Sequence, residues 1–192
     1  ESRGLGDVYK RQDKDLSCTS GGNRFQYRLG IWNEEDAANC SHNGFHCAEN
    51  PLDCLTYYSD WNSAVYYMVL VDGDIDEDAH DSKISTTRLK LVKQLNLSEF
   101  IAHSLRYMCE HPMRSDNARV SANEGEAHNG FAVVRGKNPV AKGRKGDVLG
   151  FVKEAAGSRE VSEIGLFVVD GKEILPDTWY LTDGSIMERK VA

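Results

Sequence analysis

The sequence lacks any long hydrophobic run. No segment approaches the ~18 apolar residues that a membrane-spanning helix needs, so we expect no membrane association. There is no starting Met and no apolar stretch of the kind that forms a secretory signal. The five cysteines are an odd number without a C-x-x-C pair, which disfavours a disulfide framework and favours a reducing compartment. We therefore expect a cytoplasmic protein, with a signal lost together with the true N-terminus as the alternative.

Basic residues are also in short supply. Lys and Arg number 23 against 30 Asp and Glu, which gives a formal net charge of -7 over 192 residues. Because nucleic-acid-binding proteins normally carry a basic surface, we do not expect a nucleic-acid partner. One local exception is segment 134–146, which holds five cations and no acid. This candidate basic patch consists of Arg135, Lys137, Lys142, Arg144 and Lys145.

Familiar catalytic motifs are missing as well. The sequence contains no P-loop, no G-x-G-x-x-G dinucleotide motif and no G-x-S-x-G nucleophile elbow. The acidic segment 72–81 does not place Gly and Glu where an EF-hand loop requires them, and we interpret it as a solvated loop. We therefore expect no calcium site and no cofactor.

A zinc site is disfavoured by spacing. The candidate ligands are Cys40, His42, His46 and Cys47. The two cysteines are too far apart in sequence for the usual first half of such a site. If residues 44–47 form a strand, His46 and Cys47 point to opposite faces and cannot bind one ion.

Strand-like and helix-like patterns fill most of the N-terminal half. Alternation of apolar and polar residues, or β-branched and aromatic runs, predicts strands at 23–31, 44–47, 63–71 and 83–95. Asp72-Gly73 is expected to close the third of these strands. A helix is predicted to begin at Asn50, a good N-cap followed by Pro51. The clearest helix lies between 96 and 112, where apolar residues recur on one face and Pro112 stops the pattern.

The C-terminal half has a different character. Residues 113–129 are polar without a period and are predicted to form a linker or loop. Gly136, Gly143 and Gly150 then recur every seven residues, which suggests short coils of a β-roll, with chance spacing of a common residue as the alternative. Residues 164–189 hold two Asp-Gly turns between apolar runs, typical of a β-hairpin or three-stranded meander.

These patterns together predict an α+β fold. A small mixed N-terminal domain at 13–112 would be followed by the linker and by a β-rich region at 130–192. That region would combine a short β-roll-like repeat with a β-hairpin or meander cap, since so few coils cannot bury a core alone.

The run GFHCAENPLDCLTYY, residues 44–58, resembles an uncharacterised phage and bacterial family with the motif G-F-H-A-C-E-N-P-L-D followed by a Tyr pair. The likeness covers roughly 13–97, through DKDLSC, FQYRLG, DSKIS and LVKQLNL, and extends to GKNPVAKGRKGDVL and VDGKEILPDTWY. Longer relatives carry many short Gly-ended repeats where this chain would keep a remnant. The resemblance implies a phage or prophage setting and no established activity. This chain departs from the motif because Cys47 precedes Ala48, which further disfavours a metal ligand here.

Residues 1–12 are unlike that family. The end of this stretch, DVYKRQ, resembles the translated end of a common sequencing-library adapter. We interpret residues 1–12 as an artefact fused to a gene fragment from a mixed sample, in the place of a short first strand.

Two functions are open at this point. The first is a non-catalytic binding or accessory protein of a phage or prophage, with an unknown host or virion protein as partner and oligomerisation left open. The alternative is a divergent ADP-ribosyltransferase that binds or consumes NAD, a fold that residues 44–71 weakly resemble. In that alternative Tyr27 or Arg28 would start the site, and His46 and Tyr57 would hold the nicotinamide end. The predicted strands 63–71 and 83–95 lack the Glu that would activate the acceptor, and fold analogy is a weak basis for function.

One cluster is the candidate for function under either hypothesis. It consists of His46, Glu49, Asp53, Tyr57 and Tyr58. The competing interpretation is that His46, Tyr57 and Tyr58 are core or helix-capping residues.

Overall fold

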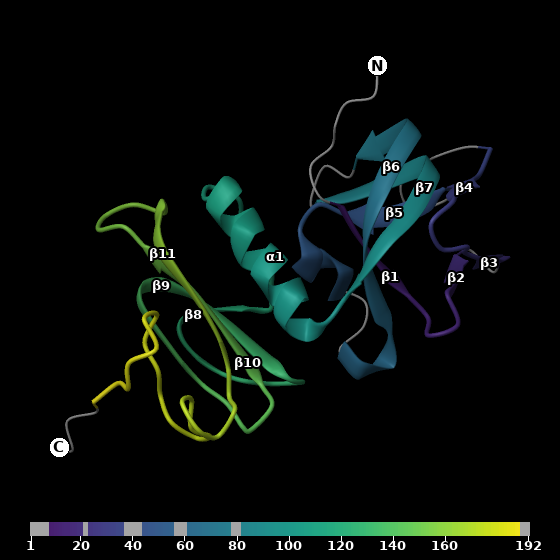
Figure 1. Ribbon diagram of the computed structural model, residues 1–192. Coiled ribbons are helices and arrows are strands. Elements are labelled where there is room, and N and C mark those ends of the chain that lie inside the picture. The colour runs from purple at the N-terminus through teal and green to yellow at the C-terminus, as the bar shows by residue number, and fades with distance from the viewer. Residues whose placement is uncertain (1–7, 21–22, 37–43, 56–60, 78–81, 189–192) are drawn as a thin grey trace. The chain divides into compact units, whose positions relative to one another are not determined.

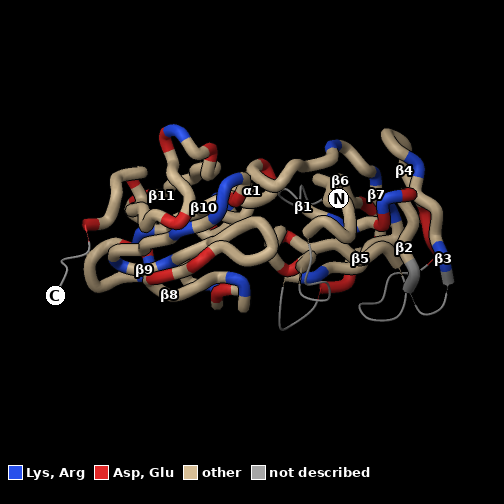
Figure 2. The backbone as a smooth tube through the Cα atoms, turned by 90° about the horizontal axis from the view of Figure 1, so that it is seen from below, with Lys and Arg blue, Asp and Glu red and all other residues tan. Residues whose placement is uncertain are grey.

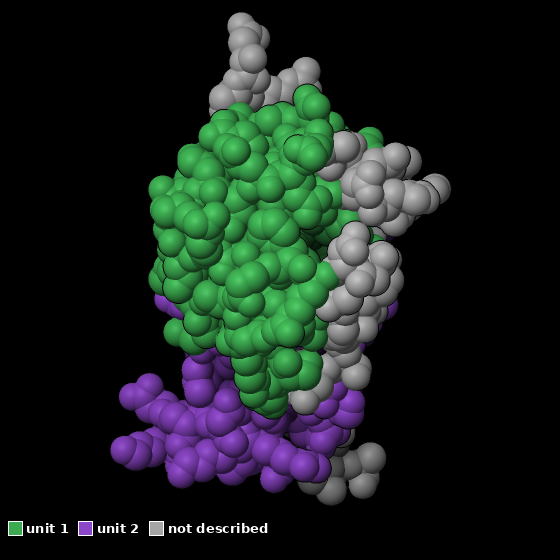
Figure 3. Space-filling view, turned by 90° about the vertical axis from the view of Figure 1, so that its right-hand side faces the viewer, with its two compact units in different colours: residues 1–96 green, residues 97–192 purple. Residues whose placement is uncertain are grey.

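The computed structural model describes residues 8–20, 23–36, 44–55, 61–77 and 82–188. The chain divides into two compact units, residues 1–96 and residues 97–192, which are coloured separately in Figure 3. Each unit contains a β-sheet of its own (Figure 1).

The sheet of the first unit closes on itself. Its strands are β1 (Val8–Gln12), β4 (Trp32–Glu34), β5 (Phe45–Ala48), β6 (Val65–Glu77) and β7 (Lys83–Leu95). They follow the order β4-β7-β5-β1-β6, and a further pairing of β6 with β7 joins four of them into an antiparallel ring. A separate hairpin, β2 (Ser17–Ser20) and β3 (Asn23–Gln26), and two 3-10 helices, η1 (Pro51–Leu55) and η2 (Trp61–Ser63), complete the unit.

Alternating side chains of the ring form the core of the first unit. The buried cluster consists of Val8, Tyr27, Phe45, Cys47, Tyr67, Val69, Ile84, Leu89 and Leu91. Phe45 and Cys47 both belong to it, so His46 between them points to the other face of β5, as the sequence predicted.

Strand β6 continues past the point where the sequence predicted its end. Gly73 has a φ of 82°, and the pairing with β7 shifts register between Asp72 and Ile75. A Cβ at Gly73 would lie 2.2 Å from Thr87 Oγ1, so the close approach of the two strands needs glycine. The Asp72-Gly73 pair is therefore a bulge inside the β6–β7 hairpin. The first part of segment 72–81, which the sequence predicted to be a solvated loop, belongs to strand β6 instead.

The second unit places a helix on one face of a four-stranded sheet (Figure 1). Its elements are α1 (Leu97–Glu110), β8 (Val120–Glu126), β9 (Phe131–Lys142), β10 (Val148–Glu154) and β11 (Val161–Val168). The order is β11-β10-β9-β8; β8–β9 and β9–β10 are parallel, and β10–β11 is antiparallel. The helix confirms the prediction at 96–112, and a Cβ at Gly150 would lie 2.9 Å from Ile101 Cγ2 of α1.

The C-terminal segment packs on the opposite face of this sheet. Leu149 and Phe151 flank Gly150 and therefore point away from α1, into a core that includes Tyr180. The backbone of Tyr180 exchanges hydrogen bonds of 2.8 and 3.1 Å with Ala141 of β9. The two Asp-Gly pairs of this segment form turns, and isolated bridges replace the expected meander strands.

The predicted α+β fold is wrong. Strands make up 51% of the structure and helices 14%, which is closer to an all-β protein. The reason is that the helix predicted from Asn50 is only the short η1, while the predicted linker at 113–129 contains strand β8.

The predicted seven-residue β-roll repeat is wrong as well. Val148 pairs with Phe131, a spacing of 17 residues, so the glycine period does not match the pairing of the strands. Gly150 lies under α1, whereas a Cβ at Gly136 would meet the side chain of Asn123 at 2.2 Å. Gly136 and Gly150 therefore each allow a different close contact and are not equivalent positions of a repeat.

Candidate functional site

Asp53 and its neighbours anchor η1 to the start of β7. Asn50 Oδ1 accepts the Leu52 amide at 3.2 Å, so Asn50 is the predicted N-cap. Asp53 Oδ2 accepts the Ser82 hydroxyl at 2.6 Å and the Ser82 amide at 3.2 Å. The Ser82 hydroxyl in turn accepts the Asn50 amide at 2.8 Å. Through this network Asp53 joins η1 to the residue before β7, which is a structural role.

His46 lies on β5 opposite Ser85, half-buried, on the outer face of the ring. Its carbonyl accepts a 2.6 Å hydrogen bond from the buried Lys10 ammonium. Burial, followed by the charges of Lys10 and Lys83, lowers the pKa of the His46 imidazole below its ordinary 6.5. The ring is therefore neutral at pH 7.

The other members of the candidate cluster can be placed only in part. Glu49 is half-buried, next to Asn50 at the end of β5, and Tyr57 and Tyr58 lie outside the described residues. Tyr27 is 2% exposed in the core, where its hydroxyl is 3.4 Å from Cys18 Sγ, and burial raises its pKa far above the ordinary value. Such a hydroxyl is not available to a ligand, and Arg28 beside it is exposed.

The zinc candidates can be placed only in part. Cys40 and His42 fall outside the described residues. Within the described ranges, no group of three or more His, Cys, Asp or Glu side chains is arranged to hold a metal ion.

Arg135 is not part of a basic surface patch. Its side chain is 2% exposed and forms ion pairs with Glu154 at 2.8 Å and Asp116 at 3.0 Å. It also donates to the carbonyls of Pro112 and Arg159 at 2.8 and 2.7 Å. The guanidinium is therefore an internal hub that joins β9, β10 and the segments after α1 and β10.

The remaining cations of the predicted patch lie at or near the surface. Lys137 is exposed, and Arg144 and Lys145 are exposed in the turn between β9 and β10. Lys142 pairs with Glu126 at 3.3 Å and lies over the Trp179 ring at 5.2 Å. Figure 2 shows positions of basic and of acidic residues along the backbone of each unit.

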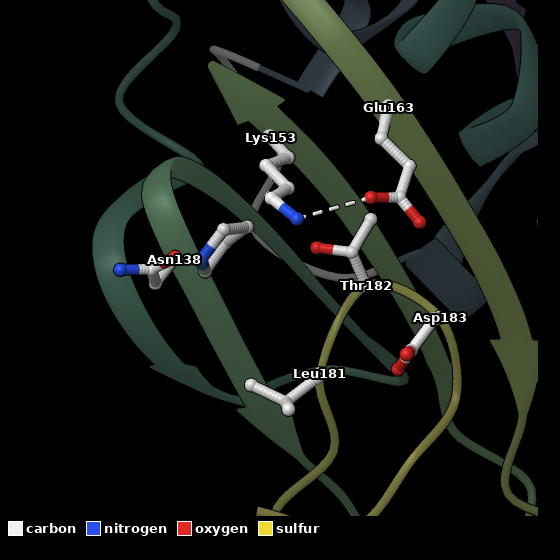
Figure 4. Close-up of a pocket in the computed structure, with 7 residues that line it drawn as sticks. Asn138, Lys153, Glu163, Leu181, Thr182 and Asp183 are labelled. Atoms are coloured by element: carbon white, nitrogen blue, oxygen red, sulfur yellow. Dashed lines mark hydrogen bonds and ion pairs between the residues drawn. The ribbon is translucent and has the colours of Figure 1, made fainter. Parts of the chain in front are cut away.

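A small open pocket lies in the second unit, between strands and the C-terminal turn (Figure 4). Its volume is about 110 Å³, and it is lined by Asn138, Pro139, Lys153, Glu163, Leu181, Thr182 and Asp183. These residues come from the middle of β9, from β10 and β11, and from the turn at 181–185. The pocket therefore exists only when four separated segments meet.

Polar groups of both charges converge in this pocket. Lys153 Nζ lies 3.2 Å from Glu163 Oε2, and both side chains are half-exposed. Asp183 Oδ1 accepts the Ser185 hydroxyl at 2.6 Å and the Ser185 amide at 2.9 Å. These hydrogen bonds hold the pKa of the Asp183 carboxyl below its ordinary 3.8, so it is charged at neutral pH.

Thr182 is the most enclosed polar residue of the pocket. It is 5% exposed, and within the described part of the chain its hydroxyl has no hydrogen-bond partner. Figure 4 shows this hydroxyl directed to the side on which the Lys153 ammonium lies. A ligand in the pocket can therefore form a hydrogen bond with this hydroxyl.

A family described as "Domain of unknown function (DUF7666)" matches residues 7–103. The chain belongs to this family. The DUF7666 segment covers the ring of strands, the candidate cluster and the first half of α1, whereas the pocket lies beyond it. No curated protein and no solved structure matches the chain.

The DUF7666 match begins at residue 7, and β1 at Val8–Gln12 pairs with both β5 and β6. These residues therefore act as the first strand of the domain, while their proposed adapter origin stays a prediction. None of the helices in the described residues is long and apolar enough to cross a membrane.

Sequence reasoning missed the pocket. Its one visible signal was the Asp183-Gly184 turn, which the sequence did predict as a turn. Nothing local indicated that Lys153 and Glu163 lie beside that turn, because they come together only through the pairing of β10 with β11.

Proposed function

We propose that this DUF7666 protein is a non-catalytic accessory protein of a phage or prophage that binds a host or virion component through its C-terminal unit. The observation that carries the proposal is the pocket at the 181–185 turn. It combines the Thr182 hydroxyl with charged groups that are open to solvent.

The candidate cluster of the first unit gives the enzyme alternative less support. Asp53 is engaged by Ser82, and the Tyr27 hydroxyl lies in the core. Neither group is presented to a substrate. The phage setting rests on the resemblance of the motif at 44–58.

Retention of cell components by the immobilised chain tests the proposal. A bacterial extract, divided into protein, envelope-glycan and nucleic-acid fractions, and purified virions are passed over wild-type protein, Glu163→Gln and Glu49→Gln. We expect one fraction to be retained by wild type and Glu49→Gln, and lost with Glu163→Gln, because only Glu163 lines the pocket.

Two results would overturn the proposal. One is retention that Glu163→Gln leaves unchanged or that no fraction shows. The other is release of nicotinamide from NAD by the folded protein, abolished by His46→Ala, which would establish the enzyme alternative.

A further inference from the structure

The pocket at the 181–185 turn also carries information about the chemistry of its ligand. Its lining holds one cation, Lys153, and two carboxylates, Glu163 and Asp183. Lys153 would repel a cationic ligand, and the two carboxylates would repel an anionic ligand. Charge of either sign is therefore opposed by a group in the pocket. A neutral ligand with several hydrogen-bonding groups meets neither obstacle.

The Lys153–Glu163 pair suits a particular arrangement of such groups. At 3.2 Å the two side chains place a donor beside an acceptor. An ammonium has three N–H donors and a carboxylate has several acceptor sites, so each keeps capacity after pairing with the other. Two neighbouring hydroxyls can therefore bond at once, one accepting from Lys153 and the other donating to Glu163.

Two further features select among neutral polyhydroxyl compounds. The Thr182 hydroxyl can donate or accept a third hydrogen bond, and Leu181 and Pro139 supply an apolar wall for C–H groups. The volume of about 110 Å³ is small beside ordinary ligand pockets of about 300–1,000 Å³, so the pocket holds one edge of a single ring while the rest of the ring lies outside its open mouth.

We propose that the pocket binds one neutral sugar unit, with neighbouring hydroxyls on Lys153 and Glu163 and a further hydroxyl on Thr182. This inference rests on the proposed binding function and names its ligand class. Because the pocket is open, the sugar can be the end or a branch of a longer glycan.

Binding of simple glycosides tests the inference. The methyl glycosides of glucose, galactose and mannose, together with glucosamine and glucuronic acid, are titrated into the full chain while protein amide shifts are followed by NMR. We expect at least one neutral glycoside to bind with a dissociation constant on the order of 1 mM, and the two charged sugars to bind more weakly.

Variants locate the site. Thr182→Val removes only the hydroxyl and should weaken binding about fivefold, whereas Lys137→Ala, an exposed change outside the pocket, should leave it unchanged. Lys153→Met provides a second pocket variant at a half-exposed position should Thr182→Val fail to fold. The proposal is overturned if no neutral glycoside binds, if a charged sugar binds more tightly, or if the pocket variants bind as wild type.

The outcome separates this inference from the proposed function. If cell components are retained through Glu163 while no glycoside binds, the sugar assignment fails and the binding function stands. If neither is observed, both fail.

Discussion

Arg135 shows that the sequence neighbours of a residue can give a wrong impression of its environment in the fold. It belongs to a cationic run, yet it is almost fully buried and paired with Glu154 and Asp116. Removing one partner of a buried ion pair leaves uncompensated charge, at a cost of about 3–5 kcal/mol. We therefore predict that Arg135→Met lowers the free energy of unfolding by that amount in urea denaturation.

Lys137→Met is the matched control for Arg135→Met. Lys137 is two residues away on the same strand and exposed, so its replacement should change stability by no more than about 0.5 kcal/mol. Equal effects of the two substitutions would mean that the Arg135 hub does not contribute to stability.

Gln12 is a buried polar residue, and no hydrogen bond within the described residues offsets the cost of burying its side chain. It is 0% exposed, and within the described residues neither atom of its side-chain amide has a hydrogen-bond partner. We predict that Gln12→Met, similar in shape, raises the free energy of unfolding by roughly 1–3 kcal/mol.

Gln26→Met provides the comparison for Gln12→Met, because Gln26 is exposed and should show no such gain. A loss of stability in Gln12→Met would indicate instead that the amide has a partner, such as an enclosed water, that the fold depends on.

His46 makes stability depend on pH. Its pKa is lowered in the folded state, first by burial and then by Lys10 and Lys83, so the unfolded chain binds the proton more readily. The contribution is fully present above the ordinary value of about 6.5 and is lost as the pH falls through the folded pKa. We predict that His46→Gln flattens this part of the stability profile, measured as urea midpoints between pH 7.5 and 5. An unchanged slope would show that the imidazole titrates normally.

At the scale of elements, the contact between β11 and the 181–185 turn forms the pocket. A Cβ on Gly165 would lie 2.1 Å from the carbonyl oxygen of Thr182, and backbone cannot move aside cheaply. We predict that Gly165→Ala displaces the turn, lowers stability by about 1–3 kcal/mol and abolishes ligand binding. Thermal unfolding and the retention assay measure the two effects, and Ile164→Ala, exposed on the same strand, should retain binding.

Elements set by local pattern were predictable from the sequence. Alternation marked β5 and β7, the apolar face marked α1, and Asn50 was recognised as a cap. The predictions that failed concerned segments whose conformation depends on strands distant in the sequence. β6 passes through a bulge at Gly73 because β7 supports it, and β8 exists because polar residues at an edge pair with β9. The C-terminal pocket was missed for the same reason, because no local pattern brings β10, β11 and the last turn together.

At the scale of the whole molecule, the boundary of the C-terminal unit is testable. The sequence placed it after residue 112, whereas the contacts place it at residue 97, with α1 included. Helix residues Ile101 and Leu105 cover Gly150, so a fragment without α1 exposes that face of the sheet. We predict that residues 97–192 are monomeric and unfold cooperatively, while residues 113–192 aggregate. Size-exclusion chromatography and circular dichroism compare them, and a well-folded 113–192 fragment would contradict the assignment.

The central claim is that this protein binds its partner through the C-terminal pocket, and mapping the bound surface tests it most directly. The retained component is added to isotopically labelled protein, and changes in amide chemical shifts are assigned along the chain. The account predicts that the largest changes fall on Asn138, Lys153, Glu163, Thr182 and Asp183. Changes centred instead on His46, Glu49 and Asp53 would contradict it and return the site to the DUF7666 segment.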